Sequence, residues 1–196
     1  HPGGGRAMGQ EARVIGFERV TKTFTTPQAV KCVLRDASFM FPSGCNVGVL
    51  GGNGAGKSTL LRMISGAELP DRGRIHRKSR VSFPLGFTGN FHAHLSGRQN
   101  VRFVARLYGA DIAEVVHFVA DFSELGQYLD MPISTYSSGM LAKLAFGLSL
   151  AIDFETYLVD EVTEVGDARF RAKCLSFFQE RMNRSNIIMV SHNSQT

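Results

Sequence analysis

The chain has 196 residues, of which 43% are apolar and 20% are charged, so its composition is that of an ordinary globular domain and excludes an acidic disordered segment. The net charge is +5, and no dense block of Lys and Arg concentrates this excess, so we expect no direct nucleic-acid partner. The longest nearly apolar run, residues 144–152, is about half of the roughly 20 residues that a membrane-spanning helix needs.

Residues 1–12 are rich in glycine and lack the apolar core of a signal peptide, so we interpret them as a flexible leader or a remnant of cloning. Residues 13–196 are expected to form one domain. The three cysteines are odd in number and show no CxxC spacing, which favours a reducing compartment over a disulfide framework or a metal site.

The first third predicts two strands, at residues 14–20 and 30–41, because both segments are rich in β-branched and aromatic residues. A short apolar strand at residues 46–50 then enters a glycine-rich stretch. A helical pattern begins at Lys57 and ends near Gly66.

Apolar residues recur at helical spacing at 100–108, 112–125 and 138–152, which predicts a helical insert over about residues 95–150. A buried strand at 156–159, a helix from Asp167 to Met182 and an apolar strand at 186–190 follow. Strands that alternate with helices predict an α/β fold, with a mostly parallel sheet covered on both faces.

The glycine-rich stretch fits the phosphate-binding pattern GxxxxGK[ST], and it lies in the required position between a strand and a helix. In such a loop the backbone N–H groups and the helix N-terminus bind phosphate oxygens, Lys57 contacts the β- and γ-phosphates, and Ser58 holds Mg²⁺. The alternative is a plain glycine turn before a helix. The nucleotide-binding residues predicted here are Gly51, Asn53, Gly54, Ala55, Gly56, Lys57, Ser58 and Thr59.

Polar residues also follow two later apolar strands. Asp160 and Glu161 end the strand at 156–159, and His192 follows the strand at 186–190. At the carboxyl edge of a parallel sheet, Asp160 is expected on the Mg²⁺ side, Glu161 beside the attacking water and His192 at the γ-phosphate. The alternatives are a solvated strand end and a histidine satisfied by solvent.

In this order the motifs resemble the nucleotide-binding domain of an ABC transporter, from about Val14 to the end of the chain. The resemblance implies a RecA-like P-loop NTPase with a helical insert and an N-terminal antiparallel β region. It also implies that the sheet continues beyond His192, so we expect the C-terminus to be truncated. The site residues that it adds are Phe24 for adenine stacking, Ser137, Ser138 and Gly139 as the signature that contacts ATP on the opposite subunit, and Asp167 at the dimer interface.

Each of these added residues has a plainer interpretation. Phe24 is one of 15 phenylalanines and would serve equally as a core residue, whereas Ser137 and Asp167 are good helix caps. The chain also departs from the family pattern. Residues 83–92 contain no glutamine to reach Mg²⁺ and water, which leaves Phe87, Thr88 or Asn90 in that place, and the signature has Ser138 and Met140 instead of glycine and glutamine.

Within the family, the resemblance is strongest to exporters of capsule, O-antigen or teichoic acid, through the segments 95–100, 136–140 and 160–170. It implies an ATP- and Mg²⁺-dependent ATPase that drives polysaccharide export through a separate permease. Two copies would pair head to tail at the cytoplasmic face of the bacterial inner membrane, as a peripheral subunit. Residues 83–100 and the stripe Arg98, Arg102 and Arg106 form the expected docking face for the permease.

Three alternatives stay open. A soluble ABC-type ATPase that acts on nucleic acid or the ribosome predicts long coiled coils or a duplicated cassette. A P-loop kinase or GTPase leaves the signature unexplained. A binding subunit without activity fits poorly with the presence of both Glu161 and His192.

Overall fold

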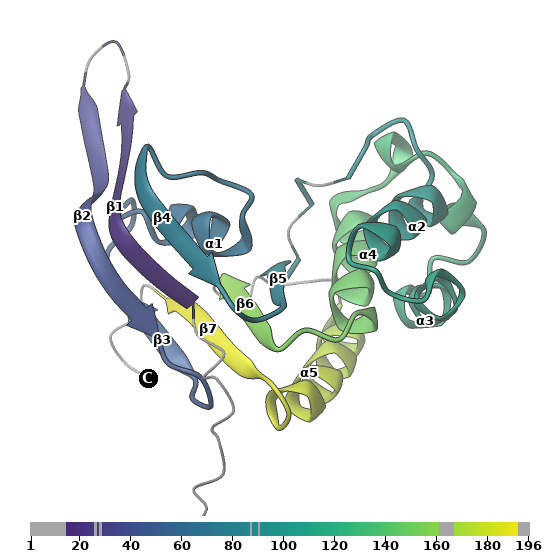
Figure 1. The fold of residues 1–196 in the computed structure, drawn as a ribbon. Helices are drawn as coiled ribbons and strands as arrows, with labels where there is room; N and C mark the ends of the chain where they lie inside the picture. The colour runs from purple at the N-terminus through teal and green to yellow at the C-terminus, as the bar shows by residue number, and fades with distance from the viewer. Residues whose placement is uncertain are drawn as a thin grey trace, which may run out of the picture.

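The computed structural model describes residues 15–25, 27, 29–86, 88, 89, 91–160 and 167–191. Two sheets and a group of helices make up this part of the chain (Figure 1). Among these residues, no helix combines the length and the apolar character needed to cross a membrane.

The first sheet is antiparallel and has the order β2-β1-β4. Its strands are β1 (Ile15–Thr25), β2 (Val30–Phe41) and β4 (Arg72–Arg77). The register of β1 and β2 places Phe24 opposite Lys31 and Ile15 opposite Phe41. Strand β1 therefore continues beyond the predicted residues 14–20, and this extension carries Phe24.

The second sheet is parallel and has the order β3-β7-β6-β5. Its strands are β3 (Val47–Leu50), β7 (Asn186–Ser191), β6 (Thr156–Asp160) and β5 (Val81–Pro84). Because neighbouring side chains on a strand point to opposite faces, Leu158 packs into one core, whereas Tyr157 and Val159 pack into the other. The predicted parallel sheet is thereby confirmed, with both faces covered.

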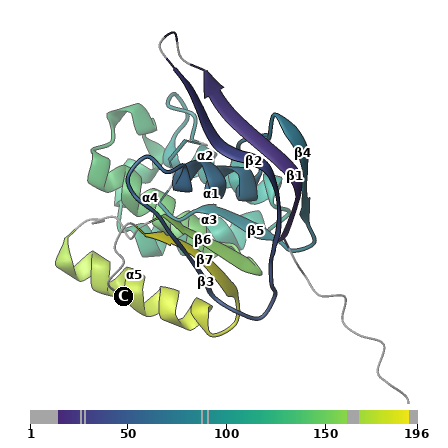
Figure 2. The same cartoon turned by 90° about the vertical axis from the view of Figure 1, so that its left-hand side faces the viewer.

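The first core lies between the two sheets. Helix α1 (Lys57–Ser65) buries Leu61, Met63 and Ile64 there, against Phe17 of the antiparallel sheet and Leu158 of the parallel one. In Figure 2 the antiparallel sheet is in front, and α1 and the parallel sheet lie behind it. The helix that starts at the phosphate-binding loop is thus held on two sides.

The second core covers the other face of the parallel sheet. It contains α2 (Gly97–Leu107), α3 (Ile112–Ser123), α4 (Ser138–Ala151) and α5 (Ala168–Met182), with two short 3-10 turns, Gly126–Asp130 and Ile133–Thr135. Helices α2, α3 and α4 lie together on the side of the molecule away from the antiparallel sheet (Figure 1). They occupy the region predicted as a helical insert.

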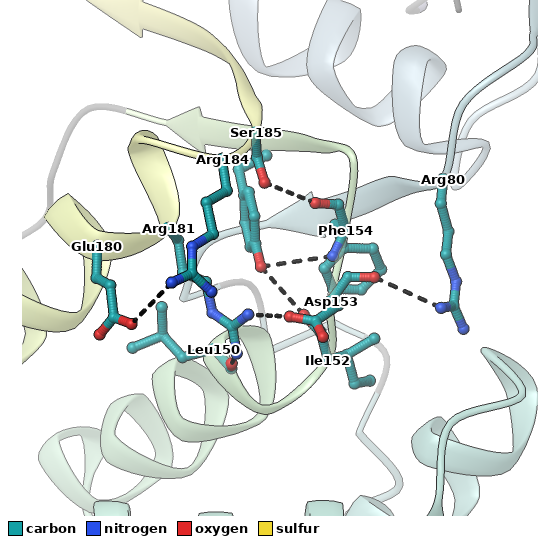
Figure 3. A network of polar contacts seen from close by, with 10 residues as sticks. Arg80, Leu150, Ile152, Asp153, Phe154, Glu180, Arg181, Arg184 and Ser185 are labelled. Atoms are coloured by element: carbon teal, nitrogen blue, oxygen red, sulfur yellow. Dashed lines mark hydrogen bonds and ion pairs between the residues drawn. The ribbon is translucent and has the colours of Figure 1, made fainter.

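A polar network ties these helices to the sheet at the start of β6. Arg181 of α5 pairs with the Asp153 carboxylate, and Arg80 donates to the Asp153 carbonyl at 3.5 Å (Figure 3). Arg80 also donates to the carbonyl of Tyr108, just after α2. Because Asp160 ends the same strand, the network braces the edge of the sheet opposite to the one where the predicted ligand site lies.

Strands β4 and β5 were not predicted from the sequence. Strand β4 has only Ile75 as an apolar residue among Arg72–Arg77, so it lacks the alternating pattern of a half-buried strand. Strand β5 is only four residues long. Both exist because a partner strand supplies the hydrogen bonds, β1 for β4 and β6 for β5.

Candidate functional site

The predicted phosphate-binding loop connects β3 to α1. Gly54 and Gly56 adopt φ angles of 75° and 99°, in the left-handed region that favours glycine. Gly56 is the N-cap residue of α1 and contributes no side-chain hydrogen bond to the first turn. The free N–H groups of that turn therefore remain available to an anion.

Lys57 is half-buried at the start of α1 and folds back onto the loop. Its Nζ donates to the carbonyl oxygens of Gly51, at 2.5 Å, and Gly52, at 2.9 Å. These contacts hold the ammonium group against the backbone of the loop.

Side chains from distant parts of the chain meet beside this loop, around a cavity of about 340 Å³. Strand β1, strand β2, the loop with the start of α1, and the carboxyl end of β6 each contribute. The predicted residues that line the cavity are Phe24, Asn53, Gly54, Gly56, Lys57, Ser58, Thr59 and Asp160. Gly51 and Ala55 belong to the loop but do not line the cavity.

Two lining residues, Lys31 and Val33, were not predicted. Both belong to β2, where Lys31 is paired with a residue of β1 and Val33 lies at an irregularity of that pairing. Lys31 is the register partner of Phe24, and its Nζ donates to the carbonyl of Gly54. No local pattern of β2 marks these two residues, so only the pairing of β2 with β1 brings them to the cavity.

Phe24 is half-buried, and a buried lysine lies against its ring. The Nζ of Lys22 is 5.1 Å from the ring centroid, and it also pairs with Glu68 at 2.5 Å and donates to the carbonyl of Leu69 at 2.9 Å. The hydrogen bond to Glu68 is the main reason that the pKa of Lys22 is raised. These contacts tie the strand that carries Phe24 to the segment after α1.

Asp71 completes this tie. Its carboxylate accepts hydrogen bonds from the backbone N–H and the hydroxyl of Thr23, at 2.7 and 2.8 Å, and pairs with Lys22 at 3.4 Å. The bond from the Thr23 backbone is the largest cause of the lowered pKa of Asp71. The two residues that precede the predicted stacking residue are thus both anchored to the segment after α1.

The signature residues lie outside the cavity. Ser137 caps α4, where its Oγ accepts from the backbone N–H of Met140 at 3.2 Å, and Ser137 and Ser138 are both exposed. Asp167 caps α5 in the same way, accepting from Phe170 at 2.8 Å, and this bond lowers its pKa. Within one chain these residues act as helix caps, the plainer of the two interpretations.

Several predicted residues fall outside the described part of the chain. They are the proposed general base Glu161, the γ-phosphate ligand His192, and Phe87 and Asn90 in the stretch that lacks a glutamine. Their roles remain predictions from the sequence.

Comparison with known proteins identifies the family. A family model described as ABC transporter matches residues 34–164. The polysialic acid transport ATP-binding protein KpsT of Escherichia coli is 50% identical over 184 residues, which cover 93% of this chain and 84% of KpsT. The capsule polysaccharide export ATP-binding protein CtrD of Neisseria meningitidis serogroup B is 52% identical over 180 residues, covering 91% of this chain and 83% of CtrD.

The fold agrees with this assignment. The dimeric post-hydrolysis structure of the ATP-binding cassette MJ0796, bound to ADP and Pi, superposes with a TM-score of 0.70 at 19% identity, over 91% of this chain and 88% of that chain. The predicted α/β cassette fold and the predicted resemblance to polysaccharide exporters are both confirmed. The chain therefore belongs to the ABC transporter family.

Proposed function

We propose that this protein is the ATP-binding and ATP-hydrolysing subunit of a transporter that exports a cell-envelope polysaccharide through a separate permease. One observation carries the proposal: Phe24, the phosphate-binding loop and Asp160 surround a single cavity. The relatives KpsT and CtrD are named as ATP-binding proteins of polysialic acid transport and capsule export, which supports export over a nucleic-acid function.

ATP binding would use the cavity from end to end. Phe24 stacks on the adenine ring, and the N–H groups at the start of α1 bind the phosphates. Lys57 exchanges two neutral carbonyl acceptors for the charged oxygens of the β- and γ-phosphates, which are the stronger partners.

The donor set suits Mg²⁺. Ser58 and Asp160 line the same cavity, and Mg²⁺ in nucleotide sites takes one or two protein oxygens together with phosphate oxygens and water. Within the described residues no cluster of three His, Cys, Asp or Glu side chains forms a metal cage. Bound there, Mg²⁺ would neutralise charge on the β- and γ-phosphates.

For hydrolysis we assign the role of general base to Glu161, the residue after Asp160. Glu161 orients the attacking water and accepts its proton, and His192 holds the γ-phosphate. A carboxylate is required for the proton transfer, whereas an amide of the same size still fills the space.

The signature residues suggest how two copies would assemble. Ser137, Ser138 and Gly139 lie at the N-terminus of a 14-residue helix, outside their own cavity. Two copies placed head to tail would bring this helix end, and Asp167 with it, toward the ATP of the partner. Each site then contains one phosphate-binding loop and one signature.

The test compares three forms of the protein in ATP binding, ATPase rate and sedimentation. Glu161→Gln is expected to bind ATP and accumulate as a dimer without turnover, because it keeps bulk and loses the carboxylate. Lys57→Ala is expected to lose most ATP affinity and to stay monomeric. Hydrolysis by Glu161→Gln at the wild-type rate would contradict the assignment.

Docking to the permease would use the exposed face of α2. Arg98 is held by Asp130 in two hydrogen bonds, of 2.6 and 3.0 Å, whereas Arg102 and Arg106 are exposed beside Phe103 and Leu107, which are 57% and 67% exposed. Such contact would place the protein peripherally at the cytoplasmic face of the inner membrane.

The test of this face is co-purification with the permease. Replacing Arg102 and Arg106 together by Glu is expected to abolish the complex and to leave ATP binding intact. The control is the pair Arg72→Glu and Arg74→Glu on β4, which carries the same change of charge on another element. If the permease co-purified with the Arg102 and Arg106 double variant as well as with the control double variant, this face would be excluded as the docking site.

A further inference from the structure

The cavity contains a second lysine that the family motifs do not include. Lys31 lies on β2 directly opposite Phe24, and both side chains line the cavity. Val33, two residues further along β2, lines it as well, so this face of the β1–β2 hairpin is turned toward the phosphate-binding loop.

The contacts of Lys31 differ from those of Lys22, the lysine beside the ring of Phe24. Lys22 is neutralised by two carboxylates, Glu68 and Asp71. Lys31 is exposed and donates to the carbonyl of Gly54, a neutral acceptor, and it forms no ion pair with any other residue that the structure describes. Its positive charge is therefore uncompensated at the wall of an anion site.

The position of Lys31 selects one part of the nucleotide. Phe24 marks the end of the cavity expected for adenine, and Lys57 marks the position of the β- and γ-phosphates. Lys31 is the cross-strand neighbour of Phe24, and it also reaches Gly54 in the loop that carries Lys57. Between these two points an adenine nucleotide has its ribose and its α-phosphate.

We propose that Lys31 is a nucleotide-binding residue that contacts the α-phosphate. This inference rests on the proposed ATP-binding function. Lys31 would exchange the Gly54 carbonyl for a charged phosphate oxygen, as Lys57 does for the carbonyls of Gly51 and Gly52. The β1–β2 hairpin would then bind the nucleotide through both its base and its first phosphate.

The experiment is a calorimetric titration of the purified protein with ATP and with ADP. Lys31→Met keeps most of the aliphatic stem and removes the charge, and it is expected to weaken both nucleotides equally, by about tenfold. Equal losses are expected because ATP and ADP share the α-phosphate. Lys31→Arg is expected to bind within about threefold of wild type, since it restores the charge.

Two controls separate this role from others. Lys78→Met removes the same charge from an exposed position outside the cavity and is expected to bind ATP as wild type does. The melting temperature of Lys31→Met is expected to equal that of wild type, because its side chain is exposed.

Three results would overturn the proposal: wild-type affinity of Lys31→Met for both nucleotides, a loss restricted to ATP, which would indicate a γ-phosphate contact, or a lowered melting temperature that accounts for the weaker binding. If wild-type protein itself does not bind ATP, the proposed function fails instead.

Discussion

Gly56 and Val33 touch so closely that no side chain fits between them. A Cβ atom built on Gly56 would lie 2.3 Å from Cγ1 of Val33. The contact sets strand β2 against the first residue before α1, so the antiparallel sheet forms a wall of the cavity directly beside the phosphate-binding loop. The glycine is required here both by its φ of 99° and by this neighbour.

Gly56→Ala is accordingly expected to destabilise the protein by about 2–4 kcal/mol, from backbone strain and overpacking together. Adding Val33→Ala removes Cγ1 and should restore part of the loss, while the strained φ remains. Urea unfolding of the single and double variants separates the cost of overpacking from the cost of backbone strain. Gly52→Ala is the control, because a Cβ there meets nothing within 4 Å; equal destabilisation by both alanines would refute the explanation.

The buried Asn100 explains part of the exporter-like segment 95–100. It is 1% exposed, its Oδ1 accepts from the N–H of His92 at 2.7 Å, and its Nδ2 donates to the carbonyls of His92, Leu95 and Ser96. Asn100→Ala leaves these groups without partners and is expected to cost about 2–3 kcal/mol in urea unfolding.

Gln99→Ala provides the comparison for that variant. It removes one of the two hydrogen bonds of a capping box, the one that the Gln99 side chain accepts from the N–H of Ser96 at 2.9 Å, and leaves the bond to the Ser96 side chain. A loss of about 1 kcal/mol or less is expected. A larger loss from Gln99→Ala than from Asn100→Ala would show that the cap, rather than the buried amide, holds the segment.

Arg77 closes the other end of α1. Its Nε donates to the carbonyl of Ile64 at 2.7 Å and its Nη2 to that of Met63 at 2.5 Å, and burial lowers its pKa. A cation at a helix C-terminus also interacts favourably with the helix dipole. Arg77→Met is expected to lower stability by about 1–2 kcal/mol, whereas the exposed Arg74→Met on the same strand should leave it within about 0.5 kcal/mol of wild type.

Asp71 should make stability depend on acid pH. Because its pKa is lowered in the folded protein, its contribution is complete above the unfolded pKa of about 4 and is lost as the pH falls through the folded value. Asp71→Asn should therefore lower the melting temperature more at pH 7 than at pH 3. Asp121→Asn, an exposed aspartate of α3, is the control. If the melting temperatures of Asp71→Asn and wild type differed by the same amount at both pH values, the role of the charge would be contradicted.

Local sequence patterns predicted the elements that carry their own signal. The loop with Lys57, the apolar strand that ends at Asp160 and the cap residues Ser137 and Asp167 each combine a periodic segment with a characteristic boundary residue. The order of these motifs was sufficient to predict the fold class and the family. Such features depend on neighbours within about ten residues, so a single sequence contains them.

The remaining features depend on contacts between distant segments. Strand β4 has the composition of a loop and becomes a strand because β1 lies beside it. Lys31 belongs to the cavity because the register of β1 and β2 turns it to the same face as Phe24, and a shift of one residue would turn it away. The sequence by itself therefore determined the phosphate-binding loop and the family, whereas only the tertiary structure decided which other side chains reach that loop, because strand pairing and register are not local properties of the chain.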